Sequence, residues 1–114
     1  MTESQVLDAT CRSLVDEPLS THDALALAQT FKIIGDPARL LIISEIAQAG
    51  ATPPTVTQLT ERLNLAQSTV SHHLKKLTSV GVVSRHRCGR EVTHSLVPET
   101  FERLSALLSY SPQQ

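Results

Sequence analysis

Aromatic side chains and cysteines are scarce in this sequence. Of its 114 residues, two are phenylalanine, one is tyrosine and none is tryptophan. A chain of this length can bury one modest core, which here must be aliphatic. A core of this kind is often completed by a partner subunit. Only two cysteines occur, Cys11 and Cys88, which excludes a disulfide-rich scaffold.

Long apolar runs are also missing. No stretch approaches the roughly 20 consecutive apolar residues that span a bilayer. Residues 1–10 include Glu3 and Asp8 and lack the apolar run of a signal peptide. We therefore expect a cytoplasmic chain that has no membrane partner.

Motifs typical of enzymes are absent as well. The sequence contains no CxxC or HExxH, no glycine-rich phosphate loop and no evident pair of carboxylates or of nucleophile and base. We expect that the protein is not an enzyme.

Charge is present but unevenly distributed. The net charge is only −1, yet residues 1–60 carry −4 and residues 61–114 carry +3. From Arg62 to Arg90 there are six basic residues and no acidic one. A local basic face attracts phosphate groups, although such a run can also be an ordinary solvated surface. Charge alone does not decide between these interpretations.

The first strong apolar periodicity begins near residue 21. A helix over residues 21–34, capped by Thr21, would carry one apolar stripe. Leu25 and Ile33 lie outside this stripe, which predicts a second burial partner, such as another subunit. Residues 1–20 are expected to form an arm that is partly flexible or a short helix, and residues 111–114 a flexible tail. The stripe consists of Ala24, Leu27, Phe31 and Ile34.

Three further helices and a hairpin are predicted. Asp36 caps a second helix that is apolar around most of its circumference, and Thr57 caps a short third one. A fourth helix covers residues 67–80 and ends at Gly81. The period then changes to alternation, which predicts strands over residues 82–87 and 91–97 with Cys88 and Gly89 in the turn. Pro98 begins a last helix, so the fold class is mainly α with a small β-hairpin.

The fourth helix has two distinct faces. At 100° per residue, its apolar residues gather on one side and its polar residues on the other. Short serine and threonine side chains, Thr69 among them, permit close approach to a DNA major groove. There Gln67 and His72 can reach base edges, and Lys75 and Lys76 can reach phosphates. An ordinary amphipathic surface helix is the alternative, but the short preceding helix, the lack of acids and the basic hairpin favour DNA. The polar face holds Ser68, Ser71, His72, Lys75 and Ser79, and the apolar face Val70, Leu74 and Leu77.

Three arginines surround the predicted hairpin turn. Arg85, Arg87 and Arg90 would form a basic finger along the DNA backbone or in the minor groove. They could equally protect the edges of a two-stranded ribbon from pairing. Two histidines have structural interpretations, since His73 flanks the apolar helix face and His94 points inward by strand alternation.

At this point the residues resemble the ArsR/SmtB family of winged helix-turn-helix repressors. The similarity covers about residues 22–109, and its most specific parts are FKIIGDPARL (residues 31–40) and QSTVSHHLKKL (residues 67–77), followed by Gly81, Gly89-Arg90 and Pro98-Glu99. The resemblance implies a homodimer that binds an inverted-repeat operator in double-stranded DNA. It also implies that the first and last helices build the dimer interface, for which the candidates are Leu25, Ile33, Phe101, Leu104 and Leu108.

The resemblance implies an effector that releases the repressor from DNA, and the cysteines bear on its nature. Arsenite and antimonite prefer three thiolate donors. Cys11 lies where some arsenic-sensing members have a cysteine pair, but Arg12 follows it and Ala51 fills the second cysteine region. Cys11 and, less directly, Cys88 are the candidate ligands for As(III), Sb(III) or another soft metal ion. A non-metal signal, such as an organic ligand or thiol oxidation, and a protein-interaction module without effector sensing are the alternatives.

Overall fold

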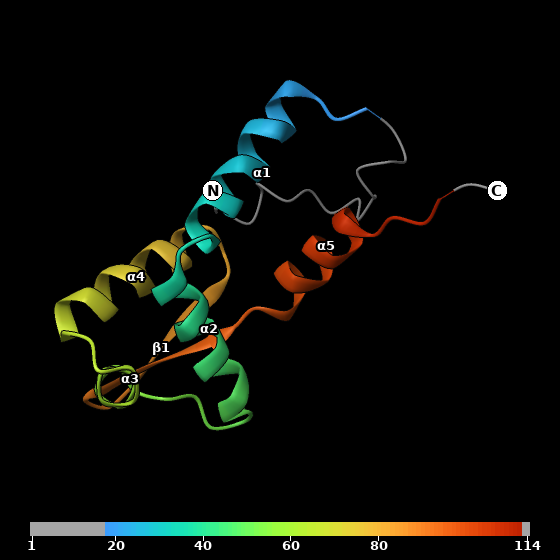
Figure 1. Cartoon of the computed structure of the whole chain (residues 1–114). Helices are drawn as coiled ribbons and strands as arrows, with labels where there is room; N and C mark the ends of the chain where they lie inside the picture. The colour runs from blue at the N-terminus through green and yellow to red at the C-terminus, as the bar shows by residue number, and fades with distance from the viewer. Residues whose placement is uncertain (1–17, 113–114) are drawn as a thin grey trace.

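The computed structural model describes residues 18–112 of the chain, and there they form five helices and one two-stranded antiparallel sheet (Figure 1). This order confirms the fold class expected from the sequence. In that part of the chain, every helix is too short or too polar to cross a membrane. The elements are α1 (Thr21–Ile34), α2 (Pro37–Ala49), α3 (Val56–Leu63), α4 (Gln67–Ser79), β1 (Val83–Cys88), β2 (Glu91–Leu96) and α5 (Pro98–Leu108).

Local hydrogen bonds determine where α1 and α3 begin. In both helices the capping residue differs from the predicted one. Ser20, not Thr21, caps α1, because its side chain accepts a hydrogen bond from the Asp23 amide at 3.0 Å. Thr55, not Thr57, caps α3 in a reciprocal box with Gln58, at 3.1 and 2.9 Å. Such a box needs Glu or Gln three residues after the cap, which only Thr55 has.

The second helix begins as predicted. Asp36 accepts a hydrogen bond from the Arg39 amide at 3.2 Å, and Pro37 occupies the first turn. Only one face of α2 is fully covered, however, because Leu40 and Leu41 remain about half exposed. Helix α2 is therefore apolar around most of its circumference, but its first turns are not buried on all sides.

The core lies between α2, α3, α4 and the start of β1. Aliphatic side chains from these elements form one continuous cluster, as the lack of aromatics predicts. The fully buried members are Ile42, Leu59, Val70, Leu74, Leu77, Val82 and Val83.

The buried face of α1 is rotated from the predicted stripe. Leu27, Thr30 and Ile33 are buried, whereas Phe31 is 37% exposed. Ile33 packs into the main core, and Leu27 packs with Leu104 of α5 in a second, smaller cluster. Two neighbours on different sides determine this rotation, and helical periodicity alone does not contain that information.

The connection from α3 to α4 is a tight turn. Asn64 has a left-handed backbone (φ 54°), which asparagine tolerates better than most residues. The Leu65 amide donates to the Thr60 carbonyl at 3.3 Å, and Ala66 is extended before α4 begins. The α3–turn–α4 unit is therefore a helix-turn-helix.

Helix α5 is attached where α4 passes into β1. Gly81 has φ 76° and reverses the chain there, and the Val82 amide bonds back to the Leu77 carbonyl at 3.0 Å. The buried Thr100 hydroxyl donates to the Gly81 carbonyl at 2.6 Å, and the Val97 amide donates to the Val82 carbonyl at 3.0 Å. These bonds tie α5 to the base of the hairpin.

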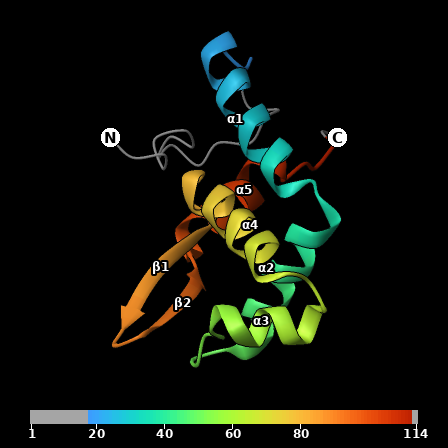
Figure 2. The same ribbon diagram turned by 90° about the vertical axis from the view of Figure 1, so that its left-hand side faces the viewer.

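The hairpin turn is one residue later than predicted. Cys88 pairs with Glu91, so the two turn residues are Gly89 and Arg90. Gly89 has φ 63°, a conformation that favours glycine in a two-residue turn. A bridge between Thr55 and Thr93 also joins β2 to the start of α3. Figure 2 shows the hairpin projecting from the helices beside α4.

Candidate nucleic-acid interface

Helix α4 presents its polar face to solvent. Val70, Leu74 and Leu77 are at most 1% exposed and dock the opposite face on the core. This division confirms the amphipathic pattern predicted from the sequence. The exposed row consists of Ser68, Ser71, His72, Lys75 and Ser79.

The first turn of α4 has no side-chain cap. Ala66 occupies the cap position, where its carbonyl accepts from the Val70 amide at 3.0 Å. The amide groups of this first turn therefore have no capping side-chain oxygen, and a helix N-terminus with uncapped amides favours an anion such as a phosphate.

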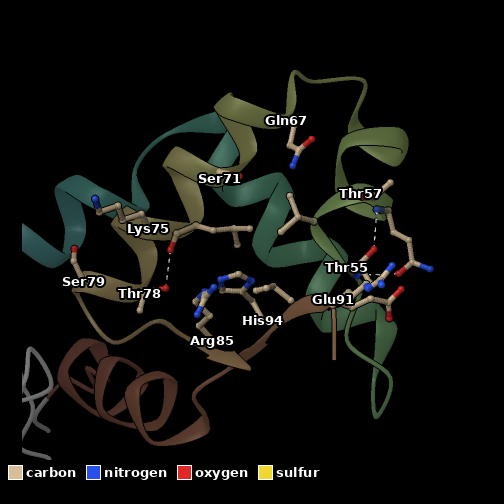
Figure 3. Close-up of a pocket in the computed structure, with 15 residues that line it drawn as sticks. Thr55, Thr57, Gln67, Ser71, Lys75, Thr78, Ser79, Arg85, Glu91 and His94 are labelled. Carbon is tan, nitrogen blue, oxygen red and sulfur yellow. Dashed lines mark hydrogen bonds between the residues drawn. The ribbon is translucent and has the colours of Figure 1, made fainter. Parts of the chain in front are cut away.

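A groove of about 990 Å³ separates α4 from the hairpin (Figure 3). The two basic segments predicted from the sequence therefore face one another across a single depression. The first turn of α3 closes one end. The polar lining of the groove includes Gln67, Ser71, Lys75 and Ser79 of α4, Thr55, Thr57 and Gln58 at the start of α3, and Arg85, Arg90, Glu91 and His94 of the hairpin.

The groove carries more positive than negative charge. Lys75, Arg85 and Arg90 line it with one carboxylate, Glu91. Within residues 18–112, no carboxylate lies within salt-bridge distance of these three cations. Arg62, by contrast, pairs with Glu45 at 3.6 Å. These three groove cations are thus available to attract phosphates.

Not every predicted DNA-binding residue lines the groove. Ser68, His72, Lys76 and Arg87 are exposed on the neighbouring surface, and Thr69 is half-buried. Sequence reasoning missed the contribution of α3, made by Thr55, Thr57 and Gln58. The spacing of the Thr55–Gln58 capping box was the signal that could have placed this helix start correctly.

His94 lies inside the groove wall, as strand alternation predicted. It is 5% exposed, and its Nδ1 atom has no hydrogen-bond partner among the described residues. Burial, together with the smaller effects of Arg85 and His86, lowers the pKa of His94 to about 4. The imidazole is therefore neutral at pH 7.

His73 is half-buried behind the exposed row, which agrees with its predicted structural role. Its Nδ1 accepts a hydrogen bond from the Arg39 Nε–H at 3.0 Å. Burial is the main cause that lowers the pKa of His73 below 6.5.

The five candidate dimer residues fall into two groups. Ile33 and Leu104 are buried within the subunit and Phe101 is half-buried against its core, so Ile33 and Leu104 are unavailable for contact with a partner. Leu25 and Leu108 are 69% and 58% exposed on α1 and α5.

The described residues do not form a metal site. Cys88 is a free, exposed thiol at the end of β1. From residue 18 to residue 112, no three His, Cys, Asp or Glu side chains gather in a way that could hold a metal ion. Cys11 lies outside the described residues.

Comparison with known proteins decides the family. Residues 36–85 match the family described as bacterial regulatory protein, arsR family. NmtR of Mycobacterium tuberculosis, a helix-turn-helix transcriptional regulator, is 34% identical over 75% of this chain and 68% of its own. The arsenical resistance operon repressor of Bacillus subtilis is 36% identical over 71% and 72%.

This chain belongs to the ArsR family. The resemblance inferred from residues 31–40 and 67–77 is confirmed, and so is the expectation of a DNA-binding transcriptional regulator rather than an enzyme.

Solved structures agree with this assignment. The homodimeric winged helix-turn-helix domain of Mb0332 from Mycobacterium bovis, described as a possible ArsR-family regulator, superposes with a TM-score of 0.63 at 26% identity and covers 78% of this chain and 82% of its own. The repressor PagR of Bacillus anthracis superposes at 0.56 with 32% identity, covering 71% and 97%. The hairpin is thus the wing of a winged helix-turn-helix.

The burial of His94 predicts that the stability of the folded protein depends on pH. The unfolded imidazole titrates near 6.5 and the folded one near 4. Between these values the unfolded chain binds more protons, so stability is fully present above pH 6.5 and is lost as the pH falls toward 4. Wild type should lose on the order of 3 kcal/mol of unfolding free energy between pH 7 and pH 4 through this group, and His94→Leu should lack this loss, as measured by urea unfolding at both pH values. His22→Leu, at an exposed site, is the control. Parallel curves for wild type and His94→Leu would contradict the assignment.

Proposed function

We propose that the protein is a homodimeric repressor that binds an inverted-repeat operator, with α4 in the major groove. The observation that carries this proposal is the exposed polar row of α4 beside the basic wing, with a groove between them. Ser68, Ser71, His72 and Gln67 would face base edges, where hydroxyl, amide and imidazole groups discriminate bases. A major groove about 12 Å wide admits such a helix.

The basic residues take the phosphate contacts in this proposal. Lys75 and Lys76 extend from the later part of α4, and Arg85, Arg87 and Arg90 extend from the wing. Arginine on a projecting hairpin suits the minor groove beside the major-groove helix, where the negative potential is enhanced in narrow segments. Thr69 is half-buried and has a smaller part than its neighbours.

The dimer is proposed to form through α1 and α5. Leu25 and Leu108 are large apolar side chains exposed on these two helices, which already pack together through Leu27 and Leu104. Burial of such side chains against a second copy would be favourable. Figures 1 and 2 both show α1 at the end of the molecule away from α3, which leaves α4 and the wing free for DNA.

The proposed interface predicts two classes of variant. Ser71→Ala and His72→Ala should reduce discrimination between operator and mutated sites, because they remove base contacts. Lys75→Gln and Arg87→Gln should weaken binding to all sequences and lower the salt slope by about one each, because they remove phosphate contacts. Fluorescence anisotropy over a salt series measures both.

A matched control is Lys32→Gln, which removes an exposed cation from α1 outside the groove. Its affinity and salt slope should equal those of wild type. Equal losses for Lys32→Gln and Lys75→Gln, or wild-type binding without sequence preference, would contradict the interface.

For the effector we propose a soft metal ion or metalloid, such as arsenite or antimonite, bound with Cys11. The support is the likeness to the arsenical resistance operon repressor and the preference of such ions for thiolates. Each chain has only two thiols, so three thiolate donors require both subunits. Thiol oxidation or an organic ligand is the second candidate, favoured by the exposed, free thiol of Cys88.

Cysteine variants separate these candidates. Arsenite should release wild-type protein from operator DNA. The Cys11→Ser variant should need an arsenite concentration at least tenfold higher for the same release, because one thiolate ligand is lost. Hydrogen peroxide in place of arsenite tests oxidation, with Cys88→Ser as the matched variant. Release of Cys11→Ser at the wild-type arsenite concentration would remove Cys11 from the mechanism.

A further inference from the structure

Arg39 joins three helices at one point. Its amide donates to Asp36 Oδ2 at 3.2 Å, within the cap of α2. Its Nη1 donates to the Ile33 carbonyl at 3.0 Å, near the end of α1, and its Nε donates to His73 Nδ1 at 3.0 Å, in the middle of α4. One guanidinium therefore connects the α1–α2 junction to the helix that carries the DNA-facing row.

The hydrogen bond to His73 fixes the protonation state of the imidazole. An arginine Nε–H can only donate, so His73 Nδ1 must accept with its lone pair. The ring is then neutral, and its proton lies on Nε2. A second proton would occupy the same lone pair and place an imidazolium against a guanidinium. Protonated His73 and this hydrogen bond are mutually exclusive.

The position of His73 on α4 allows the Arg39–His73 hydrogen bond to restrain rotation of this helix, and therefore the direction in which its DNA-facing row points. His73 follows His72 of the exposed row and precedes Leu74 of the buried face. The hydroxyls of Thr78 and Ser79 bond within α4 itself, so they do not restrain its rotation. Apolar contacts are non-directional and tolerate small rotations of a helix, whereas a hydrogen bond weakens steeply when its angle changes.

We propose that the Arg39–His73 hydrogen bond holds α4 in its DNA-binding orientation, and that protonation of His73 releases α4 and lowers DNA affinity. This inference rests on the proposed function of α4 and adds its regulation by pH. His73 acts as a positioning residue and does not contact DNA.

The charges around His73 determine the sign of the effect. Burial, Arg39 and His72 lower the pKa of His73, while Asp36 raises it, and the net direction is below 6.5. The bond is therefore intact at pH 8 and is lost only as the pH falls through the lowered pKa of His73. His72 and His86 are exposed imidazoles beside the proposed DNA-facing surface. The contribution of His73 must be isolated by a matched variant.

His73→Asn is that variant, because its side-chain oxygen can accept from Arg39 but cannot be protonated in this range. We expect His73→Asn to bind operator DNA within about twofold of wild type at pH 8. Below the pKa of His73, located by its own imidazole titration, wild type should bind about tenfold more weakly than His73→Asn, the factor typical of one lost hydrogen bond to a charged group. His72→Asn is the control for the adjacent exposed imidazole.

Removing the donor gives an independent comparison. Arg39→Met should weaken DNA binding at pH 8, and the Arg39→Met/His73→Asn pair should show the same pH profile as Arg39→Met alone, because no bond remains to lose. Affinities are corrected for the folded fraction measured by circular dichroism. Wild type and His73→Asn with parallel affinities from pH 8 to below the measured pKa of His73, or losses explained entirely by the folded fraction, would overturn the proposal.

Measurements on the free protein separate this proposal from the proposed function. Imidazole ¹⁵N shifts should show His73 as the Nε2–H tautomer at pH 8, titrating below 6.5. Amide hydrogen exchange along α4 should accelerate as His73 is protonated in wild type and not in His73→Asn. If this exchange response is observed but the protein does not bind DNA specifically, only the proposed operator function is contradicted. Titration of His73 without any change in α4 exchange would refute the release of α4.

Discussion

The attachment of one side of α4 to the aliphatic core is the constraint on which the interface depends. Val70, Leu74 and Leu77 are almost completely buried, and burying each contributes roughly 1.5–3 kcal/mol relative to exposure. With this face fixed, helical geometry forces the row that contains Ser71 and Lys75 outward. The short, polar residues of this row are therefore presented as a consequence of core packing.

The wing depends on the same core. Val82 and Val83 are buried where α4 passes into β1, and Thr100 secures α5 to this point through the Gly81 carbonyl. The basic hairpin is thus anchored at its base and free at its tip, close to the row on α4. A chain with a net charge of only −1 obtains a basic surface in this way, because Lys75, Arg85 and Arg90 come together in one groove. The same connection joins α5, a proposed dimer helix, to the DNA-facing elements.

Much of this arrangement could be predicted from the sequence because it depends on local signals. Asp36 with Pro37, the amphipathic pattern of α4 and the inward position of His94 are all properties of neighbouring residues along the chain. The rotation of α1 could not be predicted, because Ile33 and Leu27 are buried against different elements distant in sequence. The contact between Arg39 and His73, which are 34 residues apart, depends on the tertiary packing of three helices. The hairpin turn was misplaced by one residue, since strand pairing rather than alternation decides which residues face one another.

Backbone amide shifts during titration with operator DNA test the central claim most directly. The orientation of α4 and the wing predicts large, saturable shifts in residues 67–76 and 85–90, and small ones in the buried residues of α2. Shifts concentrated in α1 and α5, with residues 67–76 unchanged, would contradict the account, because the DNA would then bind a surface that the core does not orient toward it.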